Sequence, residues 1–249
     1  MATIPVQFGI EFEAVGPRSW LGFLLGQNAG LDVASDDYGD SSCWTLGEDG
    51  SVLDEKPDDN DANPDFKIYN QSSDDLECEL RTPILTWSKM GEVKKALDVM
   101  SKVCVLSNSC GMHVHVSSPV SAVVNGKKMA QLIEAKYSAR SSRKRWCHSG
   151  YSVDDKYYVV RKVWEYEWDG NIEEDADRGN NHLEVRVFDG CLDYKEVSKR
   201  VRDVIDCYRK ASVYRGRDGY GRPLARPVRV RSVGTSGLVV PVRRKLVSV

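Results

Sequence analysis

The sequence lacks several features that mark well-known classes of protein. No apolar run approaches the ~20 residues that span a membrane, and the first residues have neither the basic nor the apolar region of a signal peptide. The seven cysteines are an odd number at irregular spacing, without a C-x-x-C pair. This disfavours a disulfide framework and a zinc ribbon. We therefore expect a cytoplasmic protein with reduced thiols and no membrane contact.

Charge is distributed unevenly along the chain, although the formal net charge is only −2. Residues 32–77 contain fifteen acidic residues and two lysines, a composition typical of a solvated loop or insertion. Residues 212–249 contain nine basic residues and one acidic residue, together with several Gly and Pro. We expect a domain over residues 1–211 with an acidic insertion, followed by a basic C-terminal extension. The extension could contact nucleic acid, dock on another protein, or pack on its own domain.

Hydrophobic periodicity predicts both strands and helices in one domain. Apolar and polar residues alternate over 7–14, 76–83 and 181–190, which favours half-buried strands. Apolar residues at helical spacing predict helices within 87–106, 127–140 and 192–211. Asp193 and Glu196 form a candidate capping box at the start of the last helix. The order of elements favours an α+β fold, with an antiparallel sheet backed by helices.

Polar residues on the expected strands carry the functional signal. His113 and His115, in the stretch SNSCGMHVHVSS, are two residues apart and would share one face of a strand. They could be ordinary polar residues on a wet strand face. However, further strands place glutamates at the same kind of position: Glu11, Glu13, Glu79 and Glu184. Neighbouring carboxylates repel, and a divalent cation removes that repulsion. The pattern therefore predicts a sheet face that carries metal ions.

Six short motifs follow one another between residue 7 and about residue 208. They are GIEFE (9–13), DGS (49–51), ELRTP (79–83), CGMHVHV (110–116), RKRW (143–146) and EVRVFDG (184–190). This series resembles the small amidoligases of bacterial operons and phage genomes, within the glutamine synthetase-like carboxylate–amine ligase superfamily. The resemblance implies a glutamine synthetase-like catalytic domain with a curved, mainly antiparallel sheet backed by helices.

The same resemblance implies the chemistry. ATP would phosphorylate a carboxylate, and an amine would attack the acyl phosphate to give an amide, with Mg²⁺ or Mn²⁺ as the metal. The carboxylate and amine would belong to small molecules or peptides, which the sequence does not name. The protein would act in the cytoplasm, or in the host cytoplasm if a phage encodes it.

The resemblance also implies roles for individual residues. The implied metal ligands are Glu11, Glu13, Glu79, His113 and Glu184. The implied catalytic pair is Glu184 and Arg186, and the implied nucleotide or phosphate contacts are Arg143, Arg145 and Arg186. The residues implied on the substrate side or behind the metal ligands are His115, Asp49, Ser51 and Arg81. His148 and His182 match no motif and receive no role.

Two other functions stay open at this point. Two histidines and a glutamate could form the facial triad of a metal-dependent hydrolase or oxygenase. Alternatively, the chain could be a catalytically inactive relative that assembles with other proteins or binds nucleic acid through its basic extension.

Overall fold

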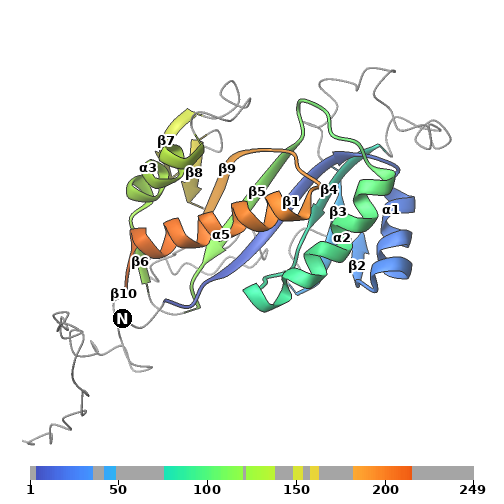
Figure 1. Cartoon of the computed structure of the whole chain (residues 1–249), viewed down its shortest axis with the longest axis horizontal. Coiled ribbons are helices and arrows are strands. Elements are labelled where there is room, and N and C mark those ends of the chain that lie inside the picture. Colours follow the sequence, from blue (N-terminus) through green and yellow to red (C-terminus); the bar gives the residue numbers. More distant parts are fainter. Residues whose placement is uncertain are drawn as a thin grey trace, which may run out of the picture. The chain divides into compact units, whose positions relative to one another are not determined.

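The computed structural model describes residues 4–35, 42–48, 76–119, 122–137, 148–153, 158–162 and 182–214. These residues belong to one compact unit, Met1–Arg215. Its centre is an eight-stranded sheet with the order β2-β3-β4-β1-β5-β9-β8-β7 (Figure 1). The strands are β1 (Gln7–Val15), β2 (Val33–Ser35), β3 (Trp44–Gly47), β4 (Glu77–Arg81), β5 (Gly111–Ser117), β7 (His148–Ser152), β8 (Tyr158–Lys162) and β9 (Leu183–Asp189).

Four α-helices within the described residues lie on one face of this sheet (Figure 1). They are α1 (Arg18–Leu24), α2 (Met90–Val103), α3 (Gly126–Tyr137) and α5 (Tyr194–Ala211). A π-helical turn, η1 (Leu25–Ala29), extends α1, and a 3-10 turn, η4 (Trp87–Lys89), precedes α2. β6 (Ala122–Val124) and β10 (Ser212–Tyr214) form a small second sheet. In these ranges, each helix is too short or too polar to cross a membrane.

The predicted α+β fold with a mainly antiparallel sheet is confirmed. Both edges of the sheet differ from the expectation, because β2 pairs with β3 in parallel and β7 pairs with β8 in parallel. These edge strands are only three to five residues long. Such short segments carry too few alternating positions to reveal a strand or its direction.

The apolar core lies between the sheet and the helices. On β1, Phe8, Ile10 and Phe12 are at most 2% exposed and belong to the same core cluster as the buried residues of α2, α3 and α5. Because successive strand residues point to opposite faces, the residues between these three point away from the helices. The core therefore fixes which face of the sheet receives the glutamates and histidines.

Helix α5 runs across the central strands on the helical face of the sheet (Figure 1), and it begins where the sequence predicts. The Asp193 side chain accepts a hydrogen bond of 2.8 Å from the backbone N–H of Glu196. This contact satisfies one of the otherwise unpaired N–H groups at a helix start. The helix buries an apolar stripe against the sheet that includes Val201, Val204 and Tyr208.

Strand register aligns the polar residues in rows across the face opposite the helices. Glu11 on the central strand β1 lies beside Arg81 of β4 on one side and beside His113 of β5 on the other. In a second row, Glu184 of β9 lies between His115 of β5 and Arg161 of β8. Residues from five strands, up to 173 positions apart in sequence (Glu11 and Glu184), thus share one small area.

Several predicted features lie outside the described residues and remain predictions. They include most of the acidic insertion and the basic extension beyond Tyr214. The same holds for the site candidates Asp49, Ser51, Arg143 and Arg145.

Candidate metal centre

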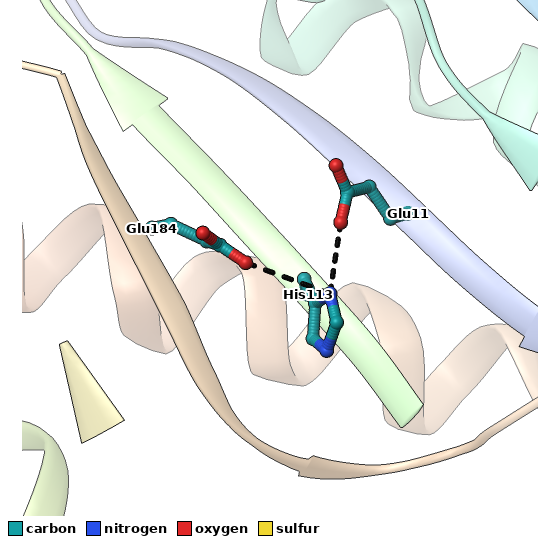
Figure 2. A group of neighbouring side chains, drawn as sticks. All are labelled: Glu11, His113 and Glu184. Atoms are coloured by element: carbon teal, nitrogen blue, oxygen red, sulfur yellow. Dashed lines mark hydrogen bonds and ion pairs between the residues drawn. The ribbon is translucent and has the colours of Figure 1, made fainter. Parts of the chain in front are cut away.

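Three side chains from three strands converge on the face of the sheet opposite the helices. Glu11 comes from β1, His113 from β5 and Glu184 from β9, and one ligand atom from each lies within 4.8 Å of the others (Figure 2). Nδ1 of His113 lies 2.8 Å from Oε2 of Glu11 and 3.5 Å from Oε1 of Glu184. Two carboxylates and an imidazole nitrogen therefore point at a common position.

The converging residues are not ordinary surface groups. His113 and His115 are 2% and 3% exposed, and Glu184 is completely buried. The simple alternative, a polar pair on a wet strand face, is therefore wrong for these two histidines. Buried ionisable groups of this kind are costly unless charge partners or a metal ion compensate them.

His113 lies among carboxylates on both sides of its ring. Its Nε2 atom is 3.2 Å from Oε1 of Glu13, while Nδ1 faces Glu11 and Glu184. A neutral imidazole carries only one N–H group, so it can donate to only one of these two sides. On the other side, a carboxylate faces a ring nitrogen without hydrogen. This contact is favourable only if that nitrogen carries a proton as well or if a metal ion lies between the two groups. The ring is therefore placed where a cation is favourable.

Glu13 and Glu79 form a second pair of carboxylates next to this group. They are directly opposite each other in the antiparallel pairing of β1 with β4, and both are at most 5% exposed. Glu13 accepts a hydrogen bond from the backbone N–H of Gly111, and Glu79 accepts one from Arg81. Like charges directly opposite each other destabilise a sheet, so this pair also favours a cation nearby.

Two arginines hold Glu184 in its ionised form. Arg186 donates to Oε1 at 2.6 Å, and Arg161 of β8 donates to Oε2. Burial alone would raise the pKa of Glu184, but the charge of Arg186, aided by both histidines of β5, lowers it to about 2. Burial would lower the pKa of Arg186, and the surrounding glutamates raise it above its usual value.

Glu11 connects the two histidines. Its Oε1 atom is 3.0 Å from Nε2 of His115, and its Oε2 atom contacts His113. Burial would raise the pKa of Glu11, but the charge of His115 and hydrogen bonds from both histidines hold it well below its usual value. Nε of Arg81, which the resemblance implies on the substrate side or behind the metal ligands, lies 3.8 Å from Oε1 of the same glutamate.

The structure adds two residues that the sequence did not single out, Arg161 and His182. Nε2 of His182 lies 3.1 Å from Nδ1 of His115. Burial, with the charge of His115, lowers the pKa of His182 to about 3, so this ring is neutral. A signal existed for His182, because it precedes Glu184 by the same two-residue step that separates Glu184 from Arg186. Arg161 had no such signal, because the short strand β8 was not predicted.

The donor set suits a hard divalent cation. The group of neighbouring charged residues contains four glutamates, Glu11, Glu13, Glu79 and Glu184, and three arginines, Arg81, Arg161 and Arg186. Carboxylate oxygens with one imidazole nitrogen are ligands that Mg²⁺ and especially Mn²⁺ accept. The residues present therefore fit the ions that the sequence motifs imply.

A buried group of carboxylates on a sheet face, flanked by arginines, is the arrangement of a candidate metal-dependent enzyme. A family model described as "Putative amidoligase enzyme" matches residues 5–142, which is more than half of the chain. The chain belongs to this family. The match includes β1, β4 and β5, and therefore every predicted metal ligand except Glu184. No curated protein sequence matches the chain.

Proposed function

We propose that the protein is an ATP-dependent ligase that joins a carboxylate to an amine. The observation that carries this proposal is the group of Glu11, His113 and Glu184, with Arg186 beside it, in a chain of the amidoligase family. The group supplies metal ligands, and the arginine supplies a fixed positive charge. Phosphoryl transfer depends mainly on these two elements, because its catalysis is largely positioning and charge neutralisation.

Glu11, His113 and Glu184 would hold one Mg²⁺ or Mn²⁺ ion, and Glu13 with Glu79 would contribute to a second. When bound, the ions would neutralise and orient the phosphates of ATP. The protein's own contribution begins with the sheet, which holds the ligands rigidly on neighbouring strands. Arg161 and Arg186 then keep Glu184 ionised and oriented, because each donates to a different oxygen of its carboxylate.

Arg186 is also the best-placed arginine for contact with a transferring phosphoryl group. Its side chain is 23% exposed, whereas the glutamate it contacts is fully buried. The ion pair with Glu184 holds the side chain in place. The partly exposed guanidinium group can therefore reach a ligand from a fixed position.

The overall reaction proceeds in two steps. A carboxylate oxygen of the substrate attacks the γ-phosphorus of ATP, and ADP leaves. The amine nitrogen then attacks the carbonyl carbon of the acyl phosphate, the C–O bond to phosphate breaks, and the amine gives up one proton. The two substrates are small-molecule or peptide carboxylates and amines.

The other functions receive less support from the geometry. A facial triad of both histidines and one glutamate requires the two rings to face one ion. Here His113 faces Glu11 and Glu184, whereas the two nitrogens of His115 face Glu11 and His182. This arrangement favours the ligase over a hydrolase or oxygenase. A role of the basic extension in nucleic-acid or protein contacts remains a prediction.

Trapping of the acyl phosphate tests the proposal. Purified protein is incubated with ATP, Mg²⁺, hydroxylamine and a panel of amino acids and peptides, and hydroxamate and ADP are measured. We expect both products from at least one carboxylate, only when nucleotide and metal are present. Arg186→Ala should lower the rate by ~10³ or more. The matched control is Arg202→Ala, since Arg202 lies over the ring of Trp87 on the helical side. Turnover of a substrate without nucleotide would instead identify a hydrolase.

A further inference from the structure

The pair of His115 and His182 is the part of this face that the proposed chemistry leaves unexplained. His182 lies immediately before β9 and reaches across to β5, where its Nε2 atom is 3.1 Å from Nδ1 of His115. The two ring centroids are 5.2 Å apart, with the planes tilted by 58°. This is a hydrogen-bonded pair of rings and not a stacked pair.

The pair extends into a continuous series of contacts that ends at the candidate metal position. His182 contacts Nδ1 of His115, and Nε2 of His115 is 3.0 Å from Oε1 of Glu11. The other oxygen of Glu11 is 2.8 Å from Nδ1 of His113. His115 uses one ring nitrogen for His182 and the other for Glu11, and Glu11 uses one oxygen for each histidine of β5. A change at His182 therefore affects the orientation of His115 and then that of Glu11.

The hydrogen-bonding roles within this series are restricted. A carboxylate oxygen only accepts, so Nε2 of His115 must carry the hydrogen that faces Glu11. Nδ1 of His115 then either accepts from His182 or donates to it, and His182 can serve in both cases because an imidazole has a donor and an acceptor tautomer. In both cases, His182 holds the ring of His115 in the orientation that presents Nε2–H to Glu11.

We propose that His182 is a positioning residue for the metal centre, and this inference rests on the proposed metal-dependent function. Through His115 it fixes Oε1 of Glu11, so that Oε2 faces the position shared by His113 and Glu184. Outer partners that orient metal ligands change metal affinity by roughly 10–100-fold when they are removed. The contacts lead from His182 through His115 to Glu11, so His182 acts on the ligand through the ring of His115.

The test compares two substitutions of His182. In His182→Gln the side-chain amide can accept or donate close to the position of Nε2, whereas in His182→Leu this ability is removed at similar volume. His148→Leu is the matched control, because His148 is an exposed histidine on the edge strand β7. Mn²⁺ affinity is measured by the paramagnetic resonance signal of free Mn²⁺. Thermal unfolding of the metal-free proteins is measured in parallel.

A third measurement is independent of the metal. In ¹⁵N-labelled, metal-free protein, the Nε2–H proton of His115 is followed by NMR, since burial beside the carboxylate of Glu11 slows its exchange with water. We expect this signal in the wild type and in His182→Gln, and its loss by exchange in His182→Leu. We also expect His182→Leu to bind Mn²⁺ about tenfold more weakly than the wild type, while His182→Gln and His148→Leu stay within about threefold.

The outcomes separate the two proposals. If His182→Leu keeps both the His115 signal and wild-type Mn²⁺ affinity, His182 is not a positioning residue, even if the variant is less stable. If the wild type binds no Mn²⁺, the proposed metal-dependent function fails. In that case, the NMR measurement still tests His182 by itself, because a His115 signal that persists in His182→Leu would show that His182 does not orient His115. Loss of affinity in His182→Gln equal to that in His182→Leu would also contradict the inference, since the amide should substitute for the ring.

Discussion

The two faces of the central sheet use the same strands for different purposes. On the helical face, β1 and β5 present Phe12, Ile10 and Val114, which are buried in the core. On the other face, the intervening residues of the same strands are Glu11 and His113. Both sets are largely shielded from water, but the first is stabilised by apolar burial and the second by charge pairing.

This difference teaches that burial alone does not identify the core of this protein. His113 is 2% exposed and Val114 is completely buried, yet His113 contacts carboxylates whereas Val114 belongs to the apolar core. The apolar face needs no ion to be stable, whereas the charged face carries more buried glutamates than arginines among its described residues. Substitutions on the first face should therefore change folding, and those on the second should change ion binding first.

The largest effect is expected from Val114→Asp. This change places a carboxylate among apolar side chains without a partner, which costs several kcal/mol or more, comparable to the whole stability of a typical domain. We expect no cooperative thermal unfolding transition by circular dichroism. Val114→Ala, the matched control, should stay folded and lose only roughly 2 kcal/mol. A cooperatively folded Val114→Asp protein would contradict the assignment of this face to the core.

The second-largest effect is expected from a substitution of His113, which precedes Val114 and lies on the charged face. His113→Ala removes a candidate ligand. Loss of a residue that only orients a ligand weakens metal binding by up to about 100-fold, so Mn²⁺ affinity should fall at least that much here. Hydroxamate formation should be lost with it. Because His113 contacts three carboxylates, the metal-free protein should also lose about 1–3 kcal/mol of unfolding free energy. His148→Ala is the control, and equal effects in both variants would show that the loss is not specific to the site.

The charged face should also make stability depend on pH. The pKa of Glu184 is about 2 in the folded protein, against 4.5 for a free side chain, and that of Glu11 is lowered as well. A lowered pKa contributes stability above pH 4.5, which is lost as the pH falls towards 2. Denaturant unfolding of the metal-free protein should therefore show a loss of the order of 3 kcal/mol from Glu184 over this interval. Glu92→Gln, a change on helix α2, should leave the loss unchanged, and a flat profile would refute the ion pairs of Glu184.

The smallest effect is expected where neither face is changed. Asp193→Ala removes the side chain that caps α5 and should cost about 1 kcal/mol in unfolding free energy. Mn²⁺ affinity should not change, because Asp193 lies at the helix start and not on the charged face. Asp193→Ser keeps a capping oxygen and should restore most of the loss. A change in Mn²⁺ affinity would show that the two faces are coupled more strongly than their contacts indicate.

The sequence predicted the central part of the molecule because that part obeys a simple period. Alternation in β1 and β9 and the H-x-H step in β5 were enough to place Glu11, His113 and Glu184 on one face. Their contacts depend on the strand order, which brings together residues that are 71 positions (His113 and Glu184) and 102 positions (Glu11 and His113) apart. Strand order cannot be read from periodicity, and here the motif series supplied the expectation that these strands are neighbours.

The missed residues show where such reasoning ends. Arg161 lies on the five-residue strand β8, and its place beside Glu184 depends on the pairing of β8 with β9. The sequence predicts no role for His182, because its partner His115 is 67 positions earlier in the chain. A hydrogen bond between two side chains leaves no periodic trace in a sequence. The parallel pairing of the edge strands was missed for the same reason, because it depends on long-range contacts.

Diffraction from a crystal soaked with Mn²⁺ and a non-hydrolysable ATP analogue tests the central claim most directly, because the anomalous signal of manganese locates the ion. The account predicts Mn²⁺ bonded to Glu11, His113 and Glu184 at about 2.1 Å, close to the Mg²⁺–oxygen distance, with the phosphates of the analogue on the same face beside Arg186. Manganese absent from this position at saturating concentration, or a nucleotide bound on the helical side of the sheet, would contradict it.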